Sequence, residues 1–150
     1  MLRAVIIDDE RKSRENLELL LQSFVENVDI VGTADGVYTG IKAINEKEPD
    51  VVFLDIHLAN GDGFQVLDGI ENRHQNIIFV TGHEEHAVKA FRSDAIDYLL
   101  KPVSIEHLQD AVERVRNRVQ NESKSENGIL ALSTSKGIQF VKTEDILYCK

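Results

Sequence analysis

The 150-residue sequence has a single cysteine and no long apolar run. Because Cys149 stands alone, the chain can form neither an internal disulfide nor a thiolate metal cluster. No stretch approaches the roughly 18 apolar residues that span a bilayer, and the N-terminus lacks the apolar segment and small-residue cleavage site of a signal peptide. We therefore expect a soluble protein of the reducing cytoplasm with no membrane partner.

The sequence also lacks internal repeats and an excess of positive charge. The formal net charge is −9, and the excess acid lies within residues 1–120, which hold 13 Lys and Arg against 22 Asp and Glu. Residues 121–150 hold four of each. Because nucleic-acid binding depends on neutralising phosphates, residues 1–120 are a poor candidate for contacting DNA themselves.

Short apolar runs alternate with amphipathic segments along residues 1–120. Runs that are apolar throughout are typical of strands buried on both faces of a parallel sheet. The predicted strands are residues 4–7, 28–32, 51–54, 77–80 and 95–100, and the helical patterns are residues 17–24, 41–44, 64–70, 87–91 and 108–119. Five βα units predict an α/β fold. Its core would be a doubly wound, five-stranded parallel sheet of the flavodoxin-like type, with strand order 2-1-3-4-5.

The composition changes after Val119. Residues 121–128 are polar and have no apolar period, which predicts a linker after a first domain of residues 1–120. Apolar runs at residues 129–132 and 138–141 flank a Ser-Lys-Gly turn and predict a β-hairpin. We expect this short C-terminal β segment, residues 129–150, to begin a second, incomplete domain.

Polar residues stand where four of the predicted strands end: Asp8 and Asp9, Asp55, Thr81, and Lys101. The carboxyl ends of parallel strands share one edge of the sheet, so these side chains should lie together. Three carboxylates repel one another, and a hard divalent cation with oxygen ligands relieves that repulsion; Mg²⁺ fits better than zinc. The lysine and the threonine could then hold phosphoryl oxygens while one carboxylate acts as the nucleophile.

Each of these residues alone has an ordinary structural explanation. The Asp8-Asp9 pair could cap the following helix, Thr81 could satisfy a backbone group, and Lys101 could simply be solvated. Asp55, at the lip of a buried strand, is evenly balanced between the two explanations. The coincidence of all five at equivalent strand ends favours a functional site.

Four motifs carry a resemblance to a known family. They are Ile7-Asp8-Asp9-Glu10, Phe53-Leu54-Asp55-Ile56-His57-Leu58 followed by Gly61-Asp62-Gly63-Phe64, Val80-Thr81-Gly82, and Tyr98-Leu99-Leu100-Lys101-Pro102. Over about residues 1–120, the chain resembles the receiver domain of two-component response regulators. The resemblance implies that Asp55 is the phosphoacceptor and that Lys101 contacts the phosphoryl group.

The same resemblance implies a metal site and a switch. Mg²⁺ would be bound directly by Asp9 and by the phosphoacceptor Asp55, through water by Asp8, and by the backbone carbonyl of His57. The remaining implied features are the switch pair Thr81 and Tyr98 and a cis peptide bond before Pro102.

Phosphoryl transfer from a phosphohistidine of a sensor histidine kinase is the implied reaction. The domain would catalyse only its own phosphorylation and dephosphorylation, so it would not be an enzyme in the usual sense. Phosphorylation would shift a pre-existing equilibrium and promote pairing with a second copy. Residues 129–150 resemble the start of a LytTR-type DNA-binding domain. This implies transcriptional regulation, with DNA bound through the full-length C-terminal domain and not through the receiver.

The sequence departs from the receiver pattern in the loops around the site. Histidines occupy the positions two after Asp55 and two after Thr81, and the usual proline of the loop after the phosphoacceptor is absent. His83 and His86 could pair at a metal with a neighbouring glutamate, although exposed histidines at a helix start are more often solvated.

Three other functions share parts of this pattern. A flavodoxin-like cofactor binder needs a Ser/Thr/Gly-rich phosphate cradle after the first strand, where Asp8-Asp9-Glu10 would repel phosphate. An aspartyl-phosphate phosphohydrolase carries a second Asp two residues after its nucleophile, and here that residue is His57. A receiver-like scaffold that is never phosphorylated lacks one of the acidic residues, and none is missing here.

Overall fold

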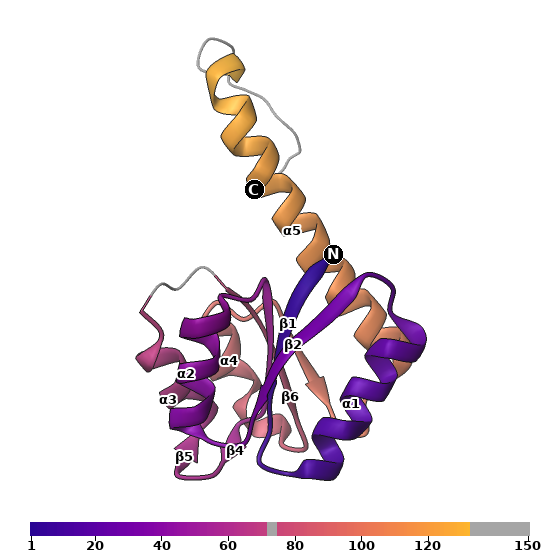
Figure 1. Cartoon of the computed structure of the whole chain (residues 1–150), viewed down its shortest axis with the longest axis vertical. Helices are drawn as coiled ribbons and strands as arrows, with labels where there is room; N and C mark the ends of the chain where they lie inside the picture. Colours follow the sequence, from indigo (N-terminus) through magenta and orange to yellow (C-terminus); the bar gives the residue numbers. More distant parts are fainter. Residues whose placement is uncertain (72–74, 133–150) are drawn as a thin grey trace. The chain divides into compact units, whose positions relative to one another are not determined.

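The predicted alternation of strands and helices is present in the computed structural model, which describes residues 1–71 and 75–132 (Figure 1). The main sheet consists of β1 (Leu2–Ile7), β2 (Val28–Ala34), β3 (Val51–Leu54), β6 (Asn76–Thr81) and β7 (Asp97–Leu100). Its order is β2-β1-β3-β6-β7, and every neighbouring pair is parallel. The predicted fold class and strand order are therefore confirmed.

The helices follow the strands as the amphipathic segments predict. They are α1 (Arg11–Phe24), α2 (Val37–Lys47), α3 (Gly63–Gly69), α4 (Ala87–Arg92), which follows the 3-10 turn η1 (Glu84–His86), and α5 (Ile105–Leu132). Between residues 1–71 and 75–132, none of these helices has the length and apolar character required to cross a bilayer.

A small antiparallel hairpin, which the sequence pattern did not predict, lies between β3 and α3. It pairs β4 (His57–Leu58) with β5 (Gly61–Asp62). Its turn places Asn60 at a φ of 69°, a left-handed conformation that asparagine adopts more readily than most residues. The side chain of Asp62 then accepts a 3.0 Å hydrogen bond from the backbone N–H of Gln65 and caps α3.

Side chains alternate between the two faces of the sheet and build two apolar layers. Val5 and Ile7 of β1 belong to the cluster that α2, α3 and α4 complete, together with Leu54 and Phe79. The residues between them face the other way, as Ile6 does, toward the side that α1 and α5 cover (Figure 1). Because helices cover both faces, β3 is buried along its whole length.

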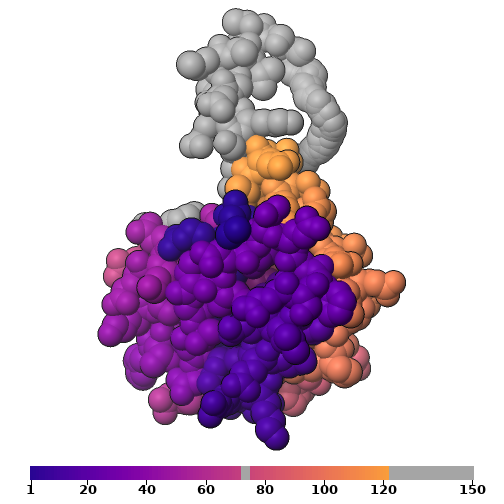
Figure 2. Space-filling model, turned by 45° about the vertical axis from the view of Figure 1, so that its right-hand side comes forward, coloured from indigo at the N-terminus to yellow at the C-terminus, as the bar shows by residue number. Residues whose placement is uncertain are grey.

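Helices α1 and α5 meet on the second face of the sheet. The side-chain amide of Gln109 donates a 2.8 Å hydrogen bond to the carbonyl of Phe24, and Arg116 donates to the carbonyl of Glu26. In Figure 2 the first turns of α5, in orange, lie against the indigo-to-violet residues of this region. These contacts lie within the compact unit Met1–Arg116.

Helix α5 corrects the prediction for residues 121–132. The predicted linker, residues 121–128, and the apolar run 129–132, expected to be a strand, are helical. The segment contains no proline, and extending an established helix costs far less than nucleating one, although Gly128 opposes it by about 1 kcal/mol. The rest of the predicted hairpin lies outside the described residues, so the division into domains stays a prediction.

Gly63 allows α3 to begin against the carboxyl end of β3. A Cβ at this position would lie 2.5 Å from the carbonyl oxygen of Asp55 and 3.2 Å from the side chain of Leu54. The Gly63 N–H also donates a 2.8 Å hydrogen bond to the carbonyl of Ile56. A side chain here would therefore displace the backbone that carries Asp55.

We expect Gly63→Ala to lower the free energy of unfolding by about 1–3 kcal/mol, because the backbone oxygen of Asp55 cannot yield as a flexible side chain can. Urea denaturation measures the change. Gly82→Ala is the matched control, since a Cβ there would meet nothing within 4 Å. Equal losses in the two variants would contradict the steric explanation.

Candidate functional site

The backbone hydrogen bonds of the sheet continue past the strands and fix the residues that follow them. The N–H of Asp55 donates to the carbonyl of Ile7 at 2.9 Å, and the N–H of Lys101 donates to the carbonyl of Thr81 at 2.9 Å. The Lys101–Pro102 peptide bond is cis, as the resemblance implies. The predicted site residues thus stand on the rigid edge of the sheet.

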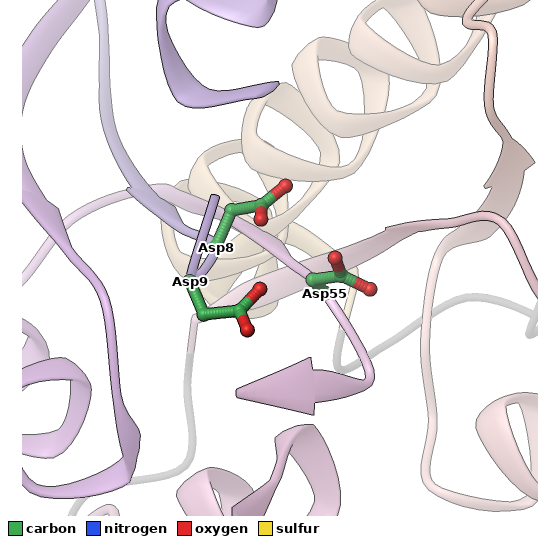
Figure 3. A group of neighbouring side chains, drawn as sticks. All are labelled: Asp8, Asp9 and Asp55. Carbon is green, nitrogen blue, oxygen red and sulfur yellow. The ribbon is translucent and has the colours of Figure 1, made fainter. Parts of the chain in front are cut away.

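Three carboxylates gather at this edge (Figure 3). Asp8, Asp9 and Asp55 each present an oxygen within 4.8 Å of the others. Asp8 and Asp55 are only 5% and 6% exposed, whereas Asp9 lies at the surface. The structure therefore brings the predicted acidic residues together, with two of them buried and one exposed to solvent.

Lys101 bridges the two buried carboxylates. Its Nζ lies 2.7 Å from Oδ2 of Asp8 and 2.9 Å from Oδ2 of Asp55. Burial alone would lower the pKa of Lys101, but the hydrogen bonds and charges of the two aspartates outweigh it and raise that pKa above its ordinary value. One ammonium against three carboxylates leaves a formal charge of two negative units, which a divalent cation would balance.

Backbone donors orient the other oxygens of the buried aspartates. Oδ1 of Asp55 accepts a 2.6 Å hydrogen bond from the N–H of Ile56, and Oδ1 of Asp8 accepts one of 2.9 Å from Glu10. The Arg14 guanidinium donates to the carbonyl of Asp8 at 2.7 Å. The sequence analysis did not identify Arg14, whose signal would have been its place on the first turn of the helix that follows Asp8.

Thr81 lies at the end of β6 and is fully buried. Its hydroxyl oxygen has no hydrogen-bond partner among the described residues. A buried hydroxyl without a partner is uncommon in folded proteins, because it has lost its water without gaining a substitute. This hydroxyl is therefore available to form a hydrogen bond with a group that binds from outside the chain.

Tyr98 of β7 is half-buried and forms a hydrogen bond with the loop after β6. Its hydroxyl donates a hydrogen bond to the carbonyl oxygen of His83. Burial raises the pKa of Tyr98, and the negative charges of Glu85 and Asp55 raise it further, against a backbone hydrogen bond at His86. The phenol is therefore a hydrogen-bond donor at neutral pH and holds this loop against β7.

Comparisons with known proteins decide the family. Residues 4–113 match the family described as the response regulator receiver domain. The chain belongs to that family. The receiver fold is shared with the response regulatory domain of mrkE from Klebsiella pneumoniae, with a TM-score of 0.72 and 28% identity over 80% of this chain and 99% of that one. The REC domain of AraT from Geobacillus stearothermophilus also has a TM-score of 0.72, with 26% identity over 82% and 98% of the two chains.

Longer curated proteins are similar to this receiver. The sensory transduction protein LytT of Bacillus cereus is 32% identical over 161 residues, covering 99% of this chain and 65% of that protein. The transcriptional regulatory protein BtsR of Escherichia coli is 37% identical over 131 residues, covering 87% of this chain and 53% of that protein. The chain thus spans between 53% and 65% of the length of these two relatives.

The donors of the receiver's acidic cluster fit a magnesium ion. Magnesium prefers carboxylate, carbonyl and water oxygens, whereas softer metals select thiolates and imidazoles. The three groups that converge here, Asp8, Asp9 and Asp55, are all carboxylates. The cluster could therefore hold a metal ion of this hard class.

We expect Lys101→Met to lower the free energy of unfolding by about 2–3 kcal/mol in the absence of divalent cations. The change leaves two buried carboxylates facing each other without their shared donor. Urea denaturation with EDTA measures this loss, and the exposed Lys42→Met serves as the matched control.

A double-mutant cycle separates this charge effect from lost packing. Adding Asp55→Asn to Lys101→Met should recover part of the stability, because one of the two repelling charges disappears. If the losses of the two single variants simply add, the bridge described above does not couple these side chains.

Proposed function

We propose that this receiver accepts a phosphoryl group on Asp55, in a magnesium-dependent reaction, from a phosphohistidine of a sensor histidine kinase. The observation that carries the proposal is the convergence of the three carboxylates with the Lys101 ammonium at the ends of β1, β3 and β7. Asp8 and Asp55 are both buried and both hydrogen-bonded to Lys101, and of these two Asp55 is the one that follows the central strand, β3.

The proposed transfer needs positioning and charge neutralisation more than acid–base chemistry. A carboxylate oxygen of Asp55 forms a bond to phosphorus while the phosphorus–nitrogen bond of the phosphohistidine breaks. The bonding electron pair returns to the imidazole of the kinase. Lys101, already in contact with Oδ2 of Asp55, would neutralise a phosphoryl oxygen.

Bound Mg²⁺ would supply further neutralisation of the phosphoryl oxygens. The residues proposed to hold it are Asp8, Asp9 and Asp55, with the backbone carbonyl of His57. The shared position of the three carboxylates supports the first part of this set. His57 lies two residues after Asp55, in β4, and its side chain is exposed, so the proposed metal ligand is its backbone carbonyl and not its imidazole.

The switch is proposed to start at Thr81. Its unpartnered hydroxyl would donate to an oxygen of the phosphoryl group on Asp55. Tyr98 would then leave the carbonyl of His83 and pack into the space that the threonine side chain vacates. This exchange would change the surface formed by α4, β7 and the start of α5.

The output of the full protein is proposed to be transcriptional regulation from the cytoplasm. The names of LytT and BtsR support a regulatory role. Residues 1–120 would be the receiver, the helical residues 121–128 the connection, and residues 129–150 the start of a LytTR-type domain that contacts DNA. Activation would pair two receivers and bring two such domains onto neighbouring half-sites.

Acetyl phosphate should phosphorylate the chain at Asp55 only when Mg²⁺ is present. Intact-mass spectrometry should find one phosphoryl group on the wild type and on Asp68→Asn, an exposed control on α3. Asp55→Asn should remain unmodified because it lacks the nucleophile, and Asp9→Ala should show little phosphorylation even with Mg²⁺ because it lacks a metal ligand. A phosphoryl adduct on Asp55→Asn would assign the chemistry to another residue.

Thr81→Ala should accept the phosphoryl group yet fail to transmit it, because the hydroxyl links the phosphoryl group to Tyr98. In analytical ultracentrifugation with Mg²⁺ and beryllofluoride, the wild type and the exposed control Thr33→Ala should sediment as dimers and Thr81→Ala as a monomer. A wild-type chain that stays monomeric under these conditions would exclude pairing as the route of output.

A further inference from the structure

Three imidazoles meet at the rim of the site, on segments that are separate in the sequence. His57 lies in β4, whereas His83 and His86 flank the 3-10 turn after β6. The ring centroids of His57 and His83 are 4.2 Å apart, those of His57 and His86 are 5.8 Å apart, and those of His83 and His86 are 6.4 Å apart. The sequence analysis considered only His83 and His86 as a possible metal pair and did not include His57.

Burial does not account for this contact. His57 and His83 are exposed and His86 is only half-buried, so the three rings are not part of the apolar core. Among the described histidines, His107 lies on α5, outside this group. Two exposed imidazoles and one half-buried imidazole that meet outside the core therefore need an explanation other than packing.

A carboxylate accompanies the three rings. Oε2 of Glu85 lies 3.7 Å from Nδ1 of His83. A hydrogen bond from its own backbone N–H lowers the pKa of Glu85, and the neighbouring His83, His86 and His57 lower it further. Glu85 thus has a carboxylate oxygen beside the ring of His83 and lies on the same 3-10 turn as His86.

We propose that His57, His83 and His86, with Glu85 as a fourth ligand, form a binding site for a late first-row divalent cation such as Zn²⁺. Around a tetrahedral zinc with metal–nitrogen bonds of about 2.0–2.1 Å, ring centres stand about 5 Å apart. The three measured separations bracket that value. Imidazole and carboxylate ligands select such metals, whereas the all-oxygen cluster selects Mg²⁺.

Metal binding requires the rings to turn. In the described rotamers only Asp8, Asp9 and Asp55 present three ligand atoms within 4.8 Å of one another. The exposed imidazoles can rotate about their side-chain bonds without displacing the core. The ion would therefore bring the ligand atoms into position, because the three histidines already lie near one another on β4 and around η1.

A bound ion would also act on the switch, and this part of the inference rests on the proposed function. The carbonyl of His83 accepts the hydrogen bond of Tyr98, so an ion that fixes His83 would stabilise the arrangement in which Tyr98 is held. The same ion would join the loop after β3 to the loop after β6. Zinc would thus oppose activation at a point beside the phosphorylation site.

Isothermal titration of the chain with Zn²⁺ tests the site without any phosphorylation. A Cys149→Ser background removes the thiolate, and excess Mg²⁺ occupies the carboxylate cluster. We expect one equivalent of Zn²⁺ to bind. His57→Gln, His83→Gln and His86→Gln should each weaken binding by at least the roughly 10- to 100-fold that loss of an outer-shell partner costs a metal site. His107→Gln should bind as the parent does.

The controls make each outcome decisive. Thermal unfolding without zinc should be the same for all four variants, because the substituted side chains lie outside the core. Absence of zinc binding by the parent, or binding that survives all three cluster substitutions, would overturn the site. An equal loss in His107→Gln would do so as well.

A second measurement separates the site from its role. Zinc should reduce beryllofluoride-induced pairing of the parent and leave that of His86→Gln unchanged. Zinc that binds at the cluster without altering pairing would overturn the regulatory part. A parent that never pairs, yet loses zinc binding in the three variants, would contradict the proposed output and uphold the metal site.

Discussion

The Lys101 ammonium holds together a sheet edge whose own charges would otherwise repel. Asp8 follows β1, Asp55 follows β3, and the lysine reaches both from the end of β7, across the intervening β6. Because both carboxylates are nearly buried, their mutual repulsion is weakly screened by water, and the bridging donor stabilises them correspondingly more. The compensation is partial, since Asp9 adds a third charge that has no such partner in the described contacts.

The apolar layers beneath this edge determine how strongly its charges act. The four residues of β3 are buried, and Asp55 is the next residue along the chain. The sheet and its covering helices therefore determine the environment of this carboxylate. The close approach of α3, allowed by Gly63, keeps that environment closed on one side.

Most of the fold could be predicted because a parallel sheet has a simple signature. Runs such as residues 51–54 are apolar throughout only when both faces of a strand are covered. Once the strands were placed, their ends had to share an edge, so the meeting of Asp8, Asp55 and Lys101 could also be predicted. The sequence does not record side-chain rotamers, which is why the double bridge made by the lysine was not anticipated.

Other features depend on contacts that a sequence pattern does not contain. The β4–β5 hairpin has two residues in each strand, too few to show an alternation. The polar residues 121–128 suit both an irregular segment and a helix, and α5 continues through them. The meeting of His57 with His83 requires the loops after two neighbouring strands to fold toward each other.

Under the proposed switch, the unpartnered hydroxyl of Thr81 would also affect how much output the pathway gives without a stimulus. Leaving such a group unsatisfied costs about 1–3 kcal/mol, and each 1.4 kcal/mol changes a population ratio about tenfold. A conformation that satisfied this hydroxyl without a phosphoryl group would be populated spontaneously and would produce output in the absence of a stimulus. In the proposed switch, the full burial of Thr81 at the end of β6 would therefore influence the basal output of the pathway as well as its response to phosphorylation.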